Sequence, residues 1–213
     1  MPLVSTHSDD FPEPRSYRFP GAVLADITTY LGPDFYSGVI FLSSTPFRSW
    51  NQEIATPWFR GMFSRYLSPD LPDLCSTARE FVGAFAFDPD RVPPAMKLSW
   101  IGAYATQHPS VKANFVARTQ DEGAFKGATG KIPVMVLLGK EDKFISPDRL
   151  GELFKETFAD AEVHIWSGVG HIPFFEEPEK TRDVISAFVK RVIEVRFYRP
   201  QVSFMRLTCF SQA

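Results

Sequence analysis

Three short, continuous runs of mostly apolar residues dominate the hydrophobic pattern of this chain. They cover residues 39–42 (VIFL), 132–138 (IPVMVLL) and 163–166 (VHIW), and each lies between glycine, serine or charged residues. Short runs without polar alternation are typical of strands that are buried on both faces of a parallel sheet. The pattern therefore predicts three strands, one early in the chain and two late.

Segments with helical periodicity follow these runs. Residues 22–31 (AVLADITTYL) predict a helix that a Gly-Pro pair ends. Ser146 and Pro147 suit the N-cap and the first position of a second helix. The apolar stripe of that helix consists of Leu150, Leu153, Phe154 and Phe158. A last helix begins at Pro178. Its stripe consists of Thr181, Val184, Ile185, Phe188, Val189 and Val192. Strands that alternate with helices predict an α/β class with a parallel sheet.

The remaining segments differ from this regular pattern. Residues 47–130 mix aromatic residues, prolines and short amphipathic stretches, which predicts several short helices. Residues 1–20 predict an irregular leader, and residues 194–213 an apolar and aromatic tail without a clear period. The core is thus expected from residues 21–46 and 131–193, with the segment 47–130 inserted between its two parts.

Composition narrows the class of protein. The 213 residues carry a net charge of -2 and 23% charged residues, and they show no basic cluster of the kind that nucleic-acid binding requires. No segment is long and apolar enough to span a membrane, and the polar start lacks the apolar core of a signal peptide. Cys75 and Cys209 fit no disulfide or metal spacing, so we expect a cytoplasmic protein without metal or cofactor. The 21 phenylalanines indicate an apolar pocket or an aromatic core.

Two residues with catalytic potential follow the two late strands. Asp142 comes shortly after the run that ends at Gly139, and His171 comes shortly after the run that ends at Ser167. Loops beyond the carboxyl ends of parallel strands are where sites form, and a carboxylate that contacts an imidazole holds it in one tautomer and orientation. If Asp142 does not contact His171, Glu141 and Glu176 are the next partners to consider. His7, His108 and His164 are expected to be structural or solvated.

The loops GKEDKFIS and GVGHIPFFEEPE resemble the acid and histidine loops of the α/β-hydrolase family, in which nucleophile, acid and histidine follow in that chain order. The resemblance extends from about residue 21 to residue 192. It implies a partial α/β-hydrolase fold, in which a short parallel sheet is flanked by helices, residues 47–130 form a helical cap, and the N-terminal part is missing. It also implies that Asp142 and His171 are catalytic, and that the substrates are small esters, amides or related acyl compounds.

The nucleophile position departs from the family. The resemblance places a Gly-x-Ser-x-Gly turn just before the helix at residues 22–31. Here residues 13–21 read EPRSYRFPG, so Ser16 is the candidate nucleophile. It lacks both glycines and stands between Arg15 and Arg18, and no apolar strand precedes it. An ungapped count back from the helix puts Arg18 at the nucleophile position. The sequence therefore predicts a truncated chain that has lost the nucleophile turn.

Two alternatives stay open at this point. Another chain could supply the missing half of a working hydrolase, or the chain could be a non-enzymatic module that binds an apolar ligand or a protein partner.

Overall fold

The structure is a computed structural model that describes residues 20–68, 70–117 and 119–198. In chain order the elements are α1 (Pro20–Leu31), η1 (Pro33–Phe35), β1 (Val39–Leu42), η2 (Arg48–Trp50), α2 (Asn51–Ile54), α3 (Pro57–Tyr66), α4 (Leu71–Gly83), η3 (Pro89–Arg91), α5 (Pro94–Thr106), α6 (Pro109–Ala117), α7 (Gly123–Lys126), β2 (Val134–Gly139), α8 (Pro147–Thr157), β3 (Glu162–Trp166), α9 (Pro173–Glu176) and α10 (Pro178–Tyr198).

Within the described part of the chain, the strands form one parallel three-stranded sheet in the order β1-β2-β3. Phe41 of β1 is paired with Val136 of β2, and Leu137 of β2 is paired with His164 of β3. The three strands, their parallel direction and the predicted α/β class are confirmed. The central strand β2 is buried along its whole length, as its unbroken apolar sequence requires.

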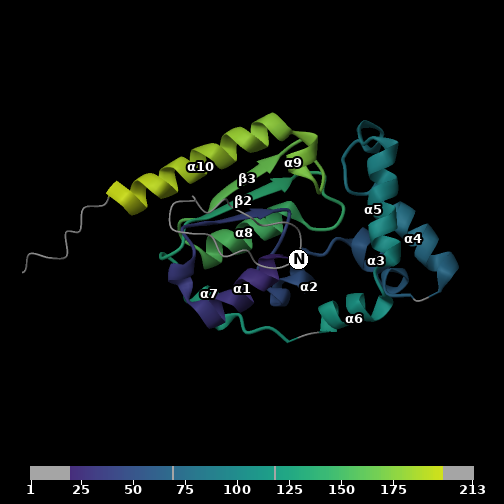
Figure 1. Ribbon diagram of the computed structural model, residues 1–213, viewed down its shortest axis with the longest axis horizontal. Coiled ribbons are helices and arrows are strands. Elements are labelled where there is room, and N and C mark those ends of the chain that lie inside the picture. Colours follow the sequence, from purple (N-terminus) through teal and green to yellow (C-terminus); the bar gives the residue numbers. More distant parts are fainter. Residues whose placement is uncertain (1–19, 69, 118, 199–213) are drawn as a thin grey trace, which may run out of the picture.

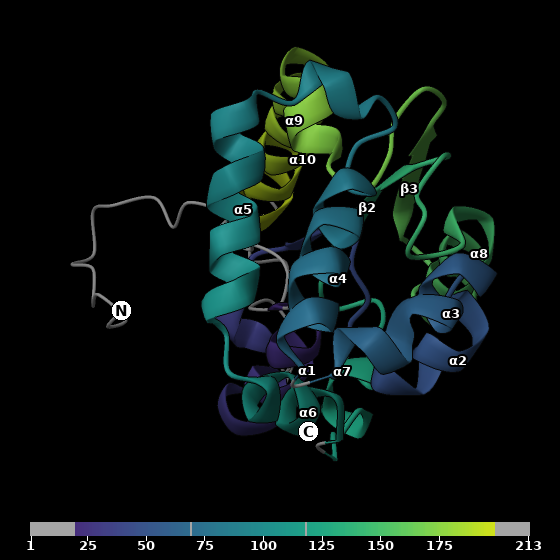
Figure 2. The same ribbon diagram turned by 90° about the vertical axis from the view of Figure 1, so that its right-hand side faces the viewer.

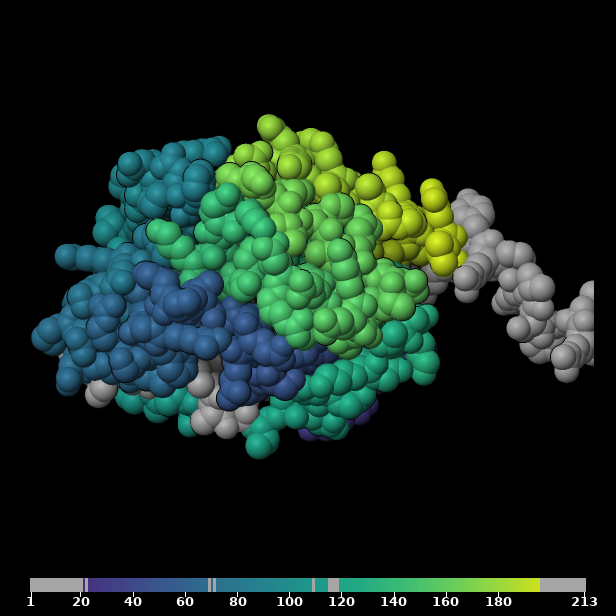
Figure 3. All heavy atoms as spheres, turned by 180° about the vertical axis from the view of Figure 1, so that it is seen from behind, coloured from purple at the N-terminus to yellow at the C-terminus, as the bar shows by residue number. Residues whose placement is uncertain are grey.

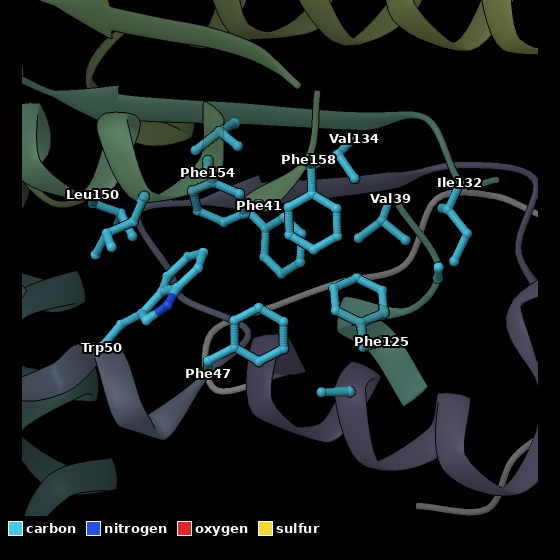
Figure 4. Packing of buried hydrophobic residues seen from close by; sticks show 14 of the residues in the cluster. Val39, Phe41, Phe47, Trp50, Phe125, Ile132, Val134, Leu150, Phe154 and Phe158 are labelled. Carbon is cyan, nitrogen blue, oxygen red and sulfur yellow. The ribbon is translucent and has the colours of Figure 1, made fainter. Parts of the chain in front are cut away.

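Side chains on one face of the sheet pack against α1, α7 and α8. Phe41 packs at 5.0 Å between ring centroids against Phe154 of α8, and Phe47 packs at 5.9 Å against Phe125 of α7. Figure 4 shows these rings between the sheet and the helices. Much of the phenylalanine content is therefore used in an aromatic core.

The opposite face of the sheet is covered by α10. Phe188 and Val192 of this helix are buried against Ile40 and Met135 of the sheet. Figure 1 shows α10 running along this face while α1 and α8 lie on the other. The stripe predicted for the last helix is the one that packs here.

Helices α3, α4 and α5 lie together beyond the carboxyl ends of β2 and β3 (Figures 1 and 2). The short helix α2 joins this group to the core, because Glu53 of α2 forms an ion pair of 2.6 Å with Arg149 of α8. In Figure 3 the blue surface of residues near 50–65 adjoins the green surface of α8 and its surroundings. The short helices predicted within residues 47–130 are present, whereas their role as a cap stays a prediction.

Ser146 stands at the N-cap of α8 and Pro147 at its first position, as predicted, but the Ser146 hydroxyl makes no capping hydrogen bond. Helix α10 continues to Tyr198, because no proline or glycine interrupts it, so the first residues of the predicted tail are helical. The predicted leader lies outside the described residues except for Pro20, which begins α1.

Candidate active site

Asp142 and His171 meet at the carboxyl edge of the sheet. Asp142 lies in the turn after β2, and His171 lies in the loop between β3 and α9. The Nδ1 atom of His171 lies 2.7 Å from Oδ2 of Asp142. The side chain of Asp142 is 0% exposed and that of His171 is 17% exposed. The structure thus brings together the two residues that the sequence singled out.

The carboxylate of Asp142 is fixed from both sides. Its Oδ1 accepts hydrogen bonds from the backbone N–H groups of Phe144, at 2.7 Å, and Ile145, at 3.2 Å. An ionised carboxylate can only accept hydrogen bonds, so Nδ1 of His171 is the donor in the bond to Oδ2. The other ring nitrogen, Nε2, is then the basic atom of the neutral imidazole. This is the arrangement that a general base requires.

Close backbone packing holds the histidine loop against the end of β2. A Cβ atom added to Gly139 would lie 2.0 Å from the carbonyl oxygen of Gly170, so only glycine fits there. Gly170 in turn packs against the segment 85–87 that follows α4, where an added Cβ would lie 2.6 Å from the nitrogen of Phe87. The N–H of His171 donates to the carbonyl of Phe85 at 2.7 Å. The loop is therefore held between β2 and the helical insertion.

Neither Glu141 nor Glu176 replaces Asp142 as the imidazole partner. Glu141 accepts hydrogen bonds through Oε2 from the N–H groups of Gly168 and Val169. Glu176 is buried, and it accepts from the N–H groups of Gly170 and Phe87. Burial raises the pKa of Glu176 above its ordinary value, and the hydrogen bonds from the two backbone N–H groups oppose that shift. Both carboxylates hold the loop that carries His171.

Aromatic side chains surround the imidazole. The ring centroid of His171 lies 4.6 Å from that of Phe144 and 6.2 Å from that of Phe85. These two phenylalanines belong to a cluster that draws on α3, α4, α5 and α9. Its other members include Val82, Ala84, Ala86, Val92, Ile172, Trp58, Phe59, Phe81, Trp100, Ile101, Ile145, Phe174 and Phe175. The imidazole of His171 therefore lies beside an extensive apolar surface.

Ser43 has an unusual conformation that the sequence did not indicate. It directly follows β1 at the same carboxyl edge, it is buried, and its φ of 42° is the one positive value among the described non-glycine residues. Its hydroxyl has no hydrogen-bond partner within the described ranges. Strained backbone and unpaired buried hydroxyls are unusual and concentrate at functional sites. Serine after an apolar run is common, so the sequence carried no signal for this conformation.

Other candidate residues have ordinary surroundings. Nε2 of His164 lies 2.7 Å from a carboxylate oxygen of Glu162, and Nδ1 of His108 lies 2.7 Å from the Ser110 hydroxyl. Cys75 is free and exposed. Ser16, His7 and Cys209 lie outside the described residues. Among the residues that the structure covers, no group of His, Cys, Asp or Glu could hold a metal ion, and no helix is suited to crossing a bilayer.

Known structures with the same arrangement of elements settle the fold. An esterase, RhEst1 from Rhodococcus sp. ECU1013, superimposes with a TM-score of 0.71 at 20% identity, over 81% of this chain and 62% of that chain. The 2-hydroxy-6-oxo-6-phenylhexa-2,4-dienoate hydrolase from Rhodococcus sp. strain RHA1 gives a TM-score of 0.59 at 17% identity, over 80% of this chain and 60% of that chain. The chain has part of the α/β-hydrolase fold.

Sequence comparison agrees with this α/β-hydrolase fold over a shorter stretch. A stretch of 60 residues is 30% identical to epoxide hydrolase EphH of Mycobacterium tuberculosis. The stretch covers 28% of this chain and 28% of that protein. No family model matches the chain. The chain spans about 60% of the length of the two Rhodococcus structures. The predicted fold class is thus confirmed.

Proposed function

We propose that this chain carries the acid–base half of a hydrolase active site, in which Asp142 orients His171 for acyl transfer. The observation that supports it most strongly is the hydrogen bond of 2.7 Å from Nδ1 of His171 to the buried carboxylate of Asp142. The two residues lie at the carboxyl edge of a parallel sheet, where active sites of such sheets form. The hydrolases and esterases of like fold are consistent with this role.

In the proposed reaction, Nε2 of His171 removes a proton from the water molecule that attacks the carbonyl carbon of the substrate. The imidazolium ion that forms is stabilised by the carboxylate of Asp142, which remains ionised. When the carbonyl re-forms and the bond to the leaving group breaks, Nε2 returns the proton to that group. The fixed position of Asp142 keeps Nε2 as the acceptor throughout.

The substrate class that we propose is small apolar esters, amides or related acyl compounds. The phenyl rings of Phe85 and Phe144 lie against His171, and the tryptophans Trp58 and Trp100 belong to the same cluster. An acyl or aryl group that reaches Nε2 would therefore contact apolar surface. Aromatic surroundings of this kind favour apolar over charged substrates.

Hydrolysis of p-nitrophenyl acetate by the purified chain tests the role of the pair. An imidazole with a free nitrogen catalyses the hydrolysis of activated esters even without a serine, so we expect slow turnover that depends on His171. His171→Ala should abolish the catalysed rate, and Asp142→Asn should lower it by about tenfold or more. His164→Ala is the matched control, because that imidazole also contacts a carboxylate but lies within β3. Equal rates for His171→Ala and the unmodified chain would refute the proposal.

We further propose that the nucleophile turn of the family is lost from this chain. The support is the sequence itself, because Ser16 has neither flanking glycine and follows acidic and proline residues. The variant Ser16→Ala should hydrolyse p-nitrophenyl acetate within about twofold of the unmodified rate, since a catalytic serine would cost on the order of a thousandfold or more. A loss of that size would identify Ser16 as the nucleophile.

A second candidate function is the binding of an apolar ligand without catalysis. The apolar, aromatic cluster beside His171 favours this function. Trp58 and Trp100 belong to the cluster and would report a bound ligand by fluorescence. A hollow of about 190 Å³ beside Phe175 and Glu176 is below the usual size of ligand pockets, so binding would require the cluster to open. Saturable quenching by a fatty acid together with no His171-dependent hydrolysis would favour this function.

A further inference from the structure

The backbone N–H groups that lead up to His171 all have acceptors. Gly168 and Val169 donate to Oε2 of Glu141, at 2.8 and 3.1 Å. Gly170 donates to Oε1 of Glu176 at 2.8 Å, and His171 donates to the carbonyl oxygen of Phe85 at 2.7 Å. The loop is therefore fixed along its length by two carboxylates and one carbonyl group.

Glu176 differs from Glu141 because it spans two parts of the fold. While Oε1 accepts from Gly170 of the histidine loop, Oε2 accepts from the N–H of Phe87 at 2.7 Å, in the segment that follows α4. The residue is 6% exposed; its hydrogen bond to Gly170 is buried and that to Phe87 is partly buried. Arg91, in the same helical insertion, donates to the backbone carbonyl of Glu176 at 3.3 Å. One side chain thus links the insertion to the loop that carries the base.

We propose that Glu176 is a positioning residue that sets the orientation of His171 by joining its loop to the helical insertion at Phe87. This inference rests on the proposed function of His171 as the base. A carboxylate that accepts two backbone N–H groups makes charge-assisted hydrogen bonds, which are stronger than neutral ones. A shift of the insertion, such as an apolar substrate would cause by entering the aromatic cluster, then reaches Gly170 and the imidazole directly. Glu176 thereby couples substrate entry to the position of Nε2.

The variant Glu176→Gln tests this coupling with little change of shape. A glutamine side chain offers one oxygen and one NH₂ group, so it can accept from either Gly170 or Phe87 but not from both. We expect amide hydrogen exchange at Gly170 and Phe87 to become about tenfold faster or more, while exchange in β2 stays unchanged. Glu176→Asp should behave alike, because its shorter side chain cannot reach both N–H groups.

A proton signal separates positioning from a purely structural role. The Nδ1 proton of His171, bonded to the buried Asp142, should give a slowly exchanging downfield resonance that is absent in His171→Ala. In Glu176→Gln we expect this resonance to broaden or vanish, with far-ultraviolet circular dichroism unchanged. Glu179→Gln is the matched control, because it removes the same charge from an exposed position in α10. The carbon-bound ring protons of His164 give a reference signal in the same spectrum, which should be unchanged in Glu176→Gln.

Two results would overturn the inference without touching the proposed function. One is a folded Glu176→Gln variant that keeps the Nδ1 resonance and hydrolyses p-nitrophenyl acetate at the unmodified rate. The other needs no variant and applies even if Glu176→Gln does not fold. In the unmodified chain the amide of Phe87 should exchange as slowly as that of Gly170, although the residue is 51% exposed. Fast exchange at Phe87 would show that the link to Glu176 is not made.

Discussion

The two sides of the sheet's carboxyl edge differ in how fully their polar groups are paired. On the side of β2 and β3, the carboxylates of Asp142, Glu141 and Glu176 each accept defined hydrogen bonds, and the imidazole of His171 is held by one of them. On the side of β1, the buried hydroxyl of Ser43 has no partner among the described residues. β1 pairs with β2, and no described strand lies on its outer side. The polar side chains beside β2 and β3 are thus paired, whereas the buried hydroxyl beside β1 is not paired within the described residues.

The largest expected effect is a loss of free energy of unfolding when the packing of β1 against the helices is removed. Phe41 is fully buried and packs against Phe125 and Phe154. Replacing Phe41 by alanine should lower the free energy of unfolding by about 4 kcal/mol, measured by urea denaturation. Phe35→Ala, at a ring that is 62% exposed, is the control and should change it by less than about 0.5 kcal/mol.

The position of β1 also affects the chain as a whole, because no described strand lies on its outer side. Edge strands invite association, so we expect a marginally stable or aggregation-prone monomer, with a free energy of unfolding below about 5 kcal/mol. The Phe41→Ala variant would then keep a free energy of unfolding of about 1 kcal/mol or less, so a detectable fraction would be unfolded without urea. A cooperative urea transition well above about 5 kcal/mol for the unmodified monomer would show that the three strands suffice.

The next effect concerns the ordered side. Replacing Asp142 by alanine leaves the N–H groups of Phe144 and Ile145 and the Nδ1 proton of His171 without their acceptor. We expect the free energy of unfolding to fall by about 3 kcal/mol, because buried donors are costly to leave unpaired. Asp148→Ala is the control, since its carboxylate is 61% exposed and pairs with Lys140 at the surface. Equal losses in both variants would mean that Asp142 is not held as described.

A smaller effect of opposite sign is expected at Ser43. Glycine adopts a positive φ without strain and removes the buried, unpaired hydroxyl. Ser43→Gly should therefore raise the free energy of unfolding by about 1 kcal/mol. Ser167→Gly, at an exposed position after β3, is the comparison and should not stabilise the chain. A loss of stability in Ser43→Gly would show that the hydroxyl has a partner in solution.

The smallest effect is a dependence on pH. Burial raises the pKa of Glu176 above its ordinary value of 4.5, so the carboxyl group binds a proton more tightly in the folded chain than in the unfolded chain. The part of the stability that comes from this tighter proton binding is therefore lost as the pH rises from about 4.5 through the raised pKa. Glu176→Gln should flatten the stability profile in this window, whereas Glu179→Gln should leave its slope unchanged.

Much of the fold and of the ordered half of the site could be predicted from the sequence. The strands and the stripes of α8 and α10 follow from local patterns, because each depends on residues whose period or spacing is visible in one segment. The family resemblance supplied the relation between the two loops. It also placed both residues at one edge of the sheet, which spacing alone does not establish.

The remaining features depend on contacts between distant segments. Glu176 and Phe87 are 89 positions apart, and no local pattern marks a carboxylate that accepts a distant backbone N–H. The conformation of Ser43 is likewise imposed by the turn after β1. The side chain of Ser146 does not cap α8, although its residue type favours a cap, and the carboxylate of Asp142 instead accepts the backbone N–H groups just before that helix.

Labelling with a fluorophosphonate probe, followed by mapping of the modified residue, tests the central claim most directly. The claim is that His171 and Asp142 form a working acid–base pair in a chain that has lost the nucleophile turn. It predicts that no serine is labelled, while slow hydrolysis of p-nitrophenyl acetate still depends on His171. Stoichiometric labelling of Ser16 that disappears in His171→Ala would contradict it, because that serine would then be a nucleophile activated by the pair.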